Sequence, residues 1–230
     1  MLNIRHFDSD AALATAVVET VTAALQAGIA SRGCASLVVP GGTTPLLYLP
    51  FLAETALDWK SVTVTLSDER WVDPTDTASN EGMVRRLLLK GRAAAATFVP
   101  LKTAMPTPHR AAAEVAQSLA SIAHPYDCVL LGMGEDGHFA SLFSDAPETA
   151  EGLSPANLSR CLGTKPANSP VPRMSLTFNE LMQHRHCIVH FKGERKMAIL
   201  EQAITARDAK KWPVNTLAVT PHSIDVFWTA

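Results

Sequence analysis

The sequence predicts an α/β fold with three layers, in which helices flank a mostly parallel central sheet. Short apolar runs rich in β-branched residues recur along the chain and are nearly continuous, as in parallel strands that are buried on both faces. Amphipathic helical patterns separate these runs, and no repeat with a period of about 20–50 residues is present. We therefore expect one Rossmann-like domain that spans residues 1–230.

The first expected helix covers residues 8–28. Asp8 or Ser9 is suited to cap its N-terminus, and Gly28 is suited to end it. We interpret this helix as packing against the sheet, because its apolar side chains form one stripe: Leu13, Val17, Val21 and Leu25.

The remaining elements alternate in type along the chain. Strands are expected at residues 35–40, 62–67, 127–133, 186–191 and 216–220, and helices at residues 45–57, 79–90, 107–123 and 194–206. Residues 147–172 are rich in Pro, Ser and Asn, but the strand and helix patterns resume after them. We interpret this segment as an excursion near the site within the same domain, which would serve as a mobile flap.

The charge balance and the cysteines limit the kind of partner and the compartment. The 230 residues carry a formal net charge of −2 without a block of like charges, so neither a nucleic-acid face nor a polybasic membrane patch is indicated. The first residues lack the regions of a signal peptide. We expect a cytoplasmic protein, compatible with a monomer, whose partner is a small molecule. Reduced thiols are expected because no C-x-x-C motif joins the cysteines, which are Cys34, Cys128, Cys161 and Cys187.

Unusual residues gather where the expected strands end, and in open parallel sheets ligands bind beyond these carboxyl ends. The first such end reads LVVPGGTTPLLYL. Gly41 and Gly42 allow close backbone approach, and the hydroxyls of Thr43 and Thr44 can donate hydrogen bonds. A helix N-terminus that follows such a loop favours an anion. This loop suits a phosphate, although similar sequences also form ordinary connections between a strand and a helix.

Three charged residues directly follow the second strand, in the sequence VTVTLSDERWVDP. Asp68, Glu69 and Arg70 would be costly to bury unless they are paired with one another or bound to a charged group. A solvated turn with a local ion pair is the alternative interpretation.

The third strand end, LLGMGEDGHFASLF, places an acid and an imidazole two residues apart. Histidine is suited to proton transfer near neutrality, and a neighbouring carboxylate can orient its ring. Asp136 and His138 are therefore candidate catalytic residues, and Gly132 and Gly134 lie beside them in the turn. A single D-G-H turn is a weak signal, but its position beside an anion loop favours the functional interpretation.

The fourth strand end, HCIVHFKGERKMAIL, places Lys196 in the first turn of a helix. The helix dipole disfavours a cation there, so an anion shared by Lys196 and the helix start would explain it. An exposed lysine is the alternative. The spacing of His184, His186 and His190 on one face of this strand is compatible with zinc, although no carboxylate or thiol is placed to complete the shell.

Together these motifs resemble the 6-phosphogluconolactonase family, within the wider group that includes glucosamine-6-phosphate deaminase. The D-E-R and G-M-G-x-D-G-H-x-A-S-L-F motifs are highly specific in combination. The matching segments run in the family's order across nearly the whole chain: GGTTP at 41–45, SDERWV at 67–72, SNEGMVRRLLL at 79–89, LLGMGEDGHFASLF at 130–143, PRMSLTFNEL at 172–181 and GERKMAIL at 193–200.

The sequence departs from the family's pattern at three positions. The first loop of the family usually reads S-G-G-S-T-P, whereas Pro40 and Thr43 replace the serines here. Thr43 preserves a hydroxyl, but Pro40 brings neither a hydroxyl nor an N–H. Phe139 stands where threonine is common.

The resemblance implies hydrolysis of 6-phosphoglucono-δ-lactone to 6-phosphogluconate, in the oxidative pentose phosphate pathway, without a metal or an organic cofactor. We hypothesise that His138 takes a proton from a water that attacks the lactone carbonyl and then returns one to the leaving ring oxygen. Asp136 would orient the imidazole, and backbone N–H groups at residues 132–134 would stabilise the oxyanion. The phosphate and hydroxyls of the substrate would be held by Asp68, Arg70, Arg173, Lys196 and the loop at residues 41–44.

Two rival functions are compatible with parts of this pattern. The deaminase family has a motif similar to D-G-H-x-A-F-N-E at this turn and needs a further acid. This chain has Phe143 at the position of the final glutamate, five residues after His138. The deaminase's D-E-Y is also replaced by D-E-R, so both differences favour the lactonase. A non-catalytic sugar-phosphate sensor of related fold is the second rival, but it would have little reason to retain Asp136 and His138 together.

Overall fold

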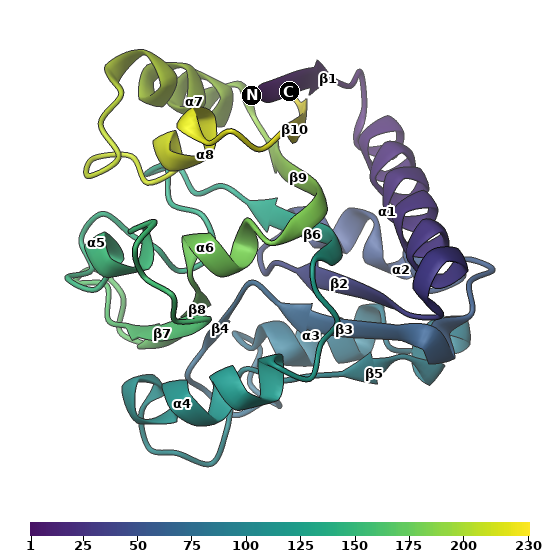
Figure 1. Cartoon of the computed structure of the whole chain (residues 1–230). Helices are drawn as coiled ribbons and strands as arrows, with labels where there is room; N and C mark the ends of the chain where they lie inside the picture. The colour runs from purple at the N-terminus through teal and green to yellow at the C-terminus, as the bar shows by residue number, and fades with distance from the viewer.

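The computed structural model describes residues 1–230 and confirms the predicted α/β class (Figure 1). Seven strands form a parallel sheet in the order β1-β10-β9-β6-β2-β3-β5, so β6 lies at its centre. The bounds of these strands are β1 Leu2–His6, β2 Ala35–Val39, β3 Val62–Leu66, β5 Thr97–Phe98, β6 Tyr126–Gly132, β9 His184–Lys192 and β10 Ile224–Thr229.

Four of the expected strands are confirmed as β2, β3, β6 and β9, and the fifth is wrong. Residues 216–220 belong to a short helix, α8 (Asn215–Val219), because a short apolar run does not by itself distinguish a strand from a buried helix. The strand next to β9 is instead β10. At the sheet edge, β1 carries mostly exposed side chains, which is why no apolar run marked it.

The first helix, α1, extends over Asp10–Arg32 and is capped by the Ser9 hydroxyl. It ends at Gly33, so the expectation that Gly28 would end it is wrong. Gly28 lies inside the helix, at a position that requires glycine because a Cβ would stand 2.5 Å from the Asp127 carboxylate. By length and composition α1 could cross a membrane, but here its apolar stripe is buried against β2, β6 and β10.

Of the other expected helices, the one at residues 194–206 is confirmed with its predicted bounds, and the rest are present with changed bounds. Residues 45–57 form two short pieces, η1 (Thr44–Leu47) and α2 (Leu49–Leu52), because Pro50 has no N–H for a continuous helix. The later helices are α3 (Asn80–Leu87), α4 (Pro108–Leu119) and α7 (Glu194–Ala206). Two further 3-10 turns are η2 (Trp59–Ser61) and η3 (Gly91–Ala95).

A second, smaller sheet packs beside the carboxyl end of the first and has the antiparallel order β4-β8-β7 (Figure 1). Its strands are β4 (Asp68–Arg70), β7 (Cys161–Thr164) and β8 (Arg173–Leu176), and the short helix α6 (Phe178–Leu181) follows β8. Residues 147–172 contain α5 (Thr149–Gly152) and the whole of β7. The interpretation of this segment as a flap is therefore wrong in part, because it supplies a paired strand.

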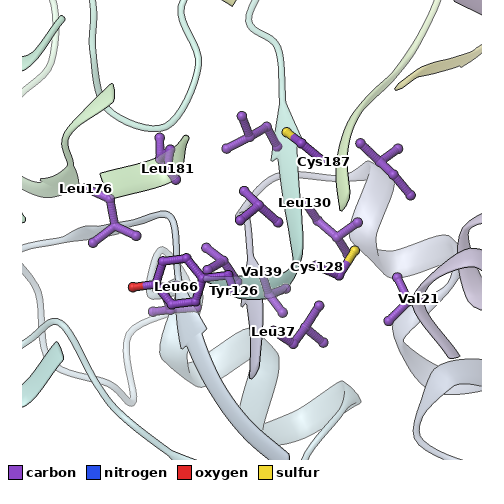
Figure 2. Close-up of a cluster of buried hydrophobic side chains, with 14 of the residues drawn as sticks. Val21, Leu37, Val39, Leu66, Tyr126, Cys128, Leu130, Leu176, Leu181 and Cys187 are labelled. Carbon is purple, nitrogen blue, oxygen red and sulfur yellow. The ribbon is translucent and has the colours of Figure 1, made fainter. Parts of the chain in front are cut away.

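The apolar side chains of the central strands, of α1 and of the segments around them form one core cluster. Figure 2 shows its middle, where side chains of β2 and β6 meet Val21 of α1. Cys128 and Cys187 lie in this core, and all four cysteines are free thiols, as the sequence predicted. Burial raises the pKa of the Cys128 thiol well above its ordinary value, and the charges of Asp127 and Asp225 add to this, so Cys128 serves as an apolar side chain.

Candidate active site

A pocket of about 270 Å³ opens at the carboxyl ends of β2, β6 and β9, as expected for an open parallel sheet. The predicted site residues converge on it from segments that lie far apart in the chain. Asp136 is the one predicted site residue that does not line the pocket. The pocket is lined by Gly41, Gly42, Thr43, Thr44, Asp68, Arg70, Gly132, Gly134, His138, Arg173 and Lys196 from the predicted set, and by Asn80, Met133, Ala140 and His190 among others.

The glycine loop offers the pocket a set of free backbone donors. None of the four N–H groups at residues 41–44 donates a hydrogen bond within the protein. Gly42 has φ +95°, a conformation that glycine adopts readily, and Thr43 then starts the turn of η1. Four free N–H groups in one loop form a concave surface that suits an anion.

The D-E-R motif forms β4, which alternates its side chains between two sides. Asp68 and Arg70 line the pocket, while Glu69 points away from it. The Asp68 carboxylate accepts hydrogen bonds from the hydroxyls of Ser67 at 3.0 Å and Ser141 at 2.6 Å. The Ser141 bond ties the D-E-R motif to the turn that carries His138.

Glu69 holds the N-terminus of α3 rather than a ligand. Its carboxylate accepts the backbone N–H groups of Arg70, Asn80 and Glu81 at 2.7–2.8 Å and the Ser79 hydroxyl at 3.0 Å. Burial raises the pKa of this carboxyl, and the hydrogen bonds oppose the rise without cancelling it. The alternative of a solvated turn is therefore wrong for Glu69, which is buried and bonded.

Arg70 and Arg173 lie directly opposite each other in the antiparallel pair of β4 and β8. Neither forms a salt bridge, and the buried Nε of each has no hydrogen-bond partner. Burial lowers the pKa of the Arg173 guanidinium; the charge of Asp68 opposes this and the charge of Arg70 adds to it. Like charges opposite each other destabilise a strand pair, so this arrangement favours a bound anion between them.

Lys196 is the third cation of the pocket and, as predicted, it lies in the first turn of α7. Its ammonium group forms no salt bridge. Burial lowers the pKa of Lys196, while the charges of Glu135 and Asp136 act in the opposite direction. The half-buried ammonium has no carboxylate partner within the protein. This supports the sequence-based expectation that Lys196 and the helix start share a bound anion.

Asp136 and His138 form the pair that the sequence predicted. The Asp136 Oδ1 lies 2.5 Å from the His138 Nδ1 and also accepts the His138 N–H at 3.3 Å. Burial raises the pKa of Asp136, but the hydrogen bond and the charge of His138 outweigh it, so the net shift is downward. An ionised Asp136 fixes the proton of the imidazole on Nδ1, which leaves the lone pair of Nε2 for chemistry.

The turn leaves no room for a side chain at Gly134. A Cβ there would stand 2.2 Å from the His138 ring, so any other residue would displace the imidazole. The Gly134 N–H already donates to the His138 carbonyl at 2.9 Å and cannot serve as an oxyanion donor. Within the expected donor segment, Met133 lines the pocket, and its N–H donates no hydrogen bond inside the protein.

Two polar residues of the pocket, Asn80 and His190, are absent from the predicted substrate-binding set. Asn80 lies in the motif after D-E-R, and its Nδ2 donates to the Asp68 carbonyl at 2.8 Å. His190 is buried in β9 with its Nε2 2.9 Å from the Tyr48 hydroxyl. Burial lowers the pKa of His190 to about 3, and the charge of Lys196 contributes to this. The available signal is a histidine within the buried part of this strand, and the sequence argument connects it only with zinc.

The three histidines of β9 do not form a metal site. His184 and His190 lie near opposite ends of the strand, and no group of three or more His, Cys, Asp or Glu residues in the chain is placed to hold a metal ion. Burial lowers the pKa of His184 to about 4, with contributions from His222 and His186. His190 reaches the pocket, whereas His184 lies beside His222 at the other end of the sheet.

The fold and the pocket define a class of α/β protein in which a parallel sheet carries free backbone donors, three cations and an acid–imidazole pair at its carboxyl edge. A family profile described as "Glucosamine-6-phosphate isomerases/6-phosphogluconolactonase" matches residues 8–228. The chain belongs to this family.

Individual relatives agree with this assignment over nearly the whole length. The chain is 38% identical over 229 residues to a 6-phosphogluconolactonase from Rhizobium meliloti, with 98% of each chain covered. It is 34% identical to a 6-phosphogluconolactonase from Pseudomonas aeruginosa, with 97% of this chain and 94% of the relative covered. The crystal structure of a 6-phosphogluconolactonase from Shewanella baltica superposes with a TM-score of 0.96 at 36% identity, covering 100% of this chain and 98% of that one.

Proposed function

We propose that this protein hydrolyses 6-phospho-D-glucono-1,5-lactone to 6-phospho-D-gluconate in the oxidative pentose phosphate pathway, as a cytoplasmic enzyme. The observation that carries the proposal is the Asp136–His138 pair, at 2.5 Å, whose imidazole lines the same pocket as three cations without carboxylate partners. A phosphorylated lactone matches both halves of this pocket. Its phosphate suits the cations and the free N–H groups, and its ester carbonyl suits an imidazole that activates water.

In the mechanism we propose, the Nε2 of His138 takes a proton from water while the water oxygen attacks the lactone carbonyl carbon. The resulting oxyanion is stabilised by the Met133 N–H. As the intermediate collapses, the bond from this carbon to the ring oxygen breaks, and His138 returns its proton to that oxygen. Asp136 holds the imidazole in the correct tautomer and stabilises its charged form.

The substrate is positioned by groups that do not take part in proton transfer. Arg173, Lys196 and the loop at residues 41–44 bind the phosphate, Arg70 binds the phosphate or a hydroxyl, and the Asp68 carboxylate accepts a hydrogen bond from a hydroxyl. Binding energy from these remote contacts holds the carbonyl against the imidazole, which raises the rate of the chemical step.

Phe143 favours the lactonase over the deaminase. Its ring is stacked on the His138 imidazole at a centroid distance of 3.8 Å, in the sequence position where the deaminase motif has its further acid. An apolar ring in that place cannot transfer the proton that opening of a sugar ring requires.

The test is the loss of freshly generated lactone at neutral pH, measured against its spontaneous hydrolysis and in the presence of a chelator. We expect wild type to accelerate the reaction and His138→Ala to lower kcat/KM by about 10²–10⁴-fold, which is the usual contribution of a general acid–base group. His109→Ala is the matched control, because His109 forms a similar pair with Glu148 at 2.8 Å outside the pocket.

The outcomes separate the competing functions. If wild type gives no acceleration, the lactonase assignment is wrong, and turnover of glucosamine 6-phosphate tests the deaminase next. Binding without turnover of either compound would indicate a sensor. If His138→Ala keeps full kcat/KM while wild type is active, the enzyme assignment stands and the general-base mechanism is wrong.

A further inference from the structure

Phe143 contacts both the candidate base and a candidate substrate-binding cation. The His138 imidazole stacks on its ring with the centroids 3.8 Å apart and an interplanar angle of 25°. The guanidinium carbon of Arg173 lies over the same ring, 4.9 Å from its centroid. One half-buried aromatic ring therefore contacts two groups that the proposed reaction needs in fixed places.

The hydrogen bond to Asp136 does not by itself fix the imidazole. That contact restrains the ring at its Nδ1 edge only, and the Nε2 edge depends on what packs against the face of the ring. A stacked neighbour adds the missing restraint, because two rings in van der Waals contact hold each other's planes. Asp136 and Phe143 together determine where the Nε2 of His138 points.

The second contact concerns charge. When His138 accepts a proton it becomes a second cation in contact with the ring that already carries the Arg173 guanidinium, and like charges in a half-buried site repel each other. The face of an aromatic ring attracts cations, so the Phe143 ring favours both charged groups while it occupies the space around them. It also keeps the guanidinium available for an anion in the pocket, instead of allowing it to move toward Asp136.

We infer that Phe143 is a positioning residue for the hydrolysis proposed above: it fixes the plane of the His138 ring and holds the Arg173 guanidinium over its own ring. The inference rests on that proposed function. Its effect comes from the aromatic face and not from the volume of the side chain. A leucine at this position fills a similar space without a π face, whereas a tyrosine keeps the ring.

The experiment compares Phe143→Leu and Phe143→Tyr in lactone hydrolysis. We expect Phe143→Leu to lower kcat by about three- to tenfold, the range that a stacked aromatic pair supports, while KM changes less than kcat. Phe143→Tyr should retain most of the wild-type kcat. Phe98→Leu is the matched control, because Phe98 is also half-buried and also carries a guanidinium, that of Arg85, at 4.9 Å, but no imidazole is stacked on it.

A spectroscopic readout tests the geometry without turnover. In the wild-type protein the ring current of Phe143 should move the His138 ring-proton resonances upfield, as identified by their absence in His138→Ala. The upfield shift should be lost in Phe143→Leu and kept in Phe143→Tyr and Phe98→Leu. Melting temperatures of all variants show that the comparison is made on folded protein.

The results distinguish this inference from the proposed function. If wild type is active and Phe143→Leu has the same kcat, or Phe143→Tyr falls as far as Phe143→Leu, the role of Phe143 is wrong and the lactonase stands. If the upfield shift persists in Phe143→Leu, the stacked arrangement is wrong. If wild type shows no turnover, the proposed function fails and this inference fails with it.

Discussion

The two ends of β6 differ in whether the buried charged side chains near them have partners of opposite charge within the protein. Near Tyr126, where the strand begins, the Glu180 carboxylate accepts hydrogen bonds from His124, from the Tyr126 hydroxyl and from Arg160, all at 2.8–3.0 Å. Near Gly132, on the order of 20 Å away at ~3.3 Å per residue, the pocket holds three cations without a carboxylate partner.

The difference shows which charges serve the fold and which serve a ligand. A buried ion loses its hydration, and only partners inside the protein offset that cost. At the Tyr126 end each donor has the same acceptor, so Glu180 joins segments that are 20 to 56 residues apart in the chain. At the Gly132 end Arg70 and Arg173 have only neutral hydrogen-bond acceptors, the Ala78 carbonyl and the Ser169 hydroxyl, and no carboxylate partner, so a bound anion would offset more of the cost.

The largest expected effect comes from breaking the paired end. Glu180→Gln replaces an acceptor of three donors by an amide whose NH₂ group faces donors, and leaves Arg160 without a counter-charge. We expect it to lower the free energy of unfolding by about 3 kcal/mol, at the low end for a broken buried pair because Arg160 is 33% exposed. Urea denaturation measures this loss. Folded Glu180→Gln should keep the wild-type kcat/KM.

Glu148→Gln is the control for this substitution. Glu148 also pairs with a histidine, His109, at 2.8 Å, but both side chains are more exposed than Glu180. An exposed pair contributes about 0–1 kcal/mol, so Glu148→Gln should change stability far less. Equal losses in the two variants would show that burial of the Glu180 cluster does not determine its contribution.

The second effect sharpens the comparison at the other end. Arg173→Met removes one of two opposed guanidiniums, so in phosphate-free buffer the free energy of unfolding should stay the same or rise. Phosphate at 100 times its Kd should stabilise wild type by about 2.7 kcal/mol, and Arg173→Met by much less. Thermal unfolding with and without inorganic phosphate measures both effects.

Arg85→Met is the control, because Arg85 contacts Phe98 and Glu81 outside the pocket. It should keep the full response to phosphate. If phosphate stabilises Arg173→Met as much as Arg85→Met, Arg173 does not hold the anion, and the absence of a carboxylate partner has another origin.

The spacing of neighbouring residues predicted local pairs, and the strand ends and the family resemblance predicted which distant segments line the pocket, but individual contacts between distant side chains were missed. Asp136 and His138 could be paired in advance because a two-residue spacing in a glycine turn brings them together. The pairing of Tyr48 with His190 joins residues 142 positions apart, and no local pattern indicates it. The Glu180 cluster was missed for the same reason.

Similar limits apply to the fold. The buried central strands were predicted because both of their faces need apolar side chains. The edge strand β1 was missed because its mixed side chains are exposed, and residues 216–220 were assigned to a strand because five apolar or β-branched residues satisfy both patterns. Asn80 was not predicted to line the pocket, because its place there depends on the contact between α3 and β4, which the sequence does not indicate.

The smallest effect concerns pH, and it should have opposite signs for Glu180 and for Glu69, the carboxylate beneath the cations. Burial raises the pKa of Glu180, but the hydrogen bonds of His124 and Tyr126 and the charges of His124 and Arg160 lower it further, so the net shift is downward. For Glu69, burial prevails and the pKa is raised.

These shifts determine how each carboxyl changes stability on acidification. A lowered pKa in the folded state means that the stability from Glu180 is complete above the ordinary glutamate value of about 4.3 and is lost as the pH falls below it. A raised pKa means that folded Glu69 binds its proton before the unfolded chain does, so stability rises as the pH falls toward that value. The free energy of unfolding, measured by urea denaturation, is compared between wild type and each variant from neutral to acidic pH. As the pH falls, the difference between wild type and Glu180→Gln should decrease. The stability of wild type relative to Glu69→Gln should increase. If both differences change in the same direction with pH, the pKa values of Glu180 and Glu69 are not shifted in opposite directions. The contrast between the two ends of β6 would then not include these two carboxyl groups.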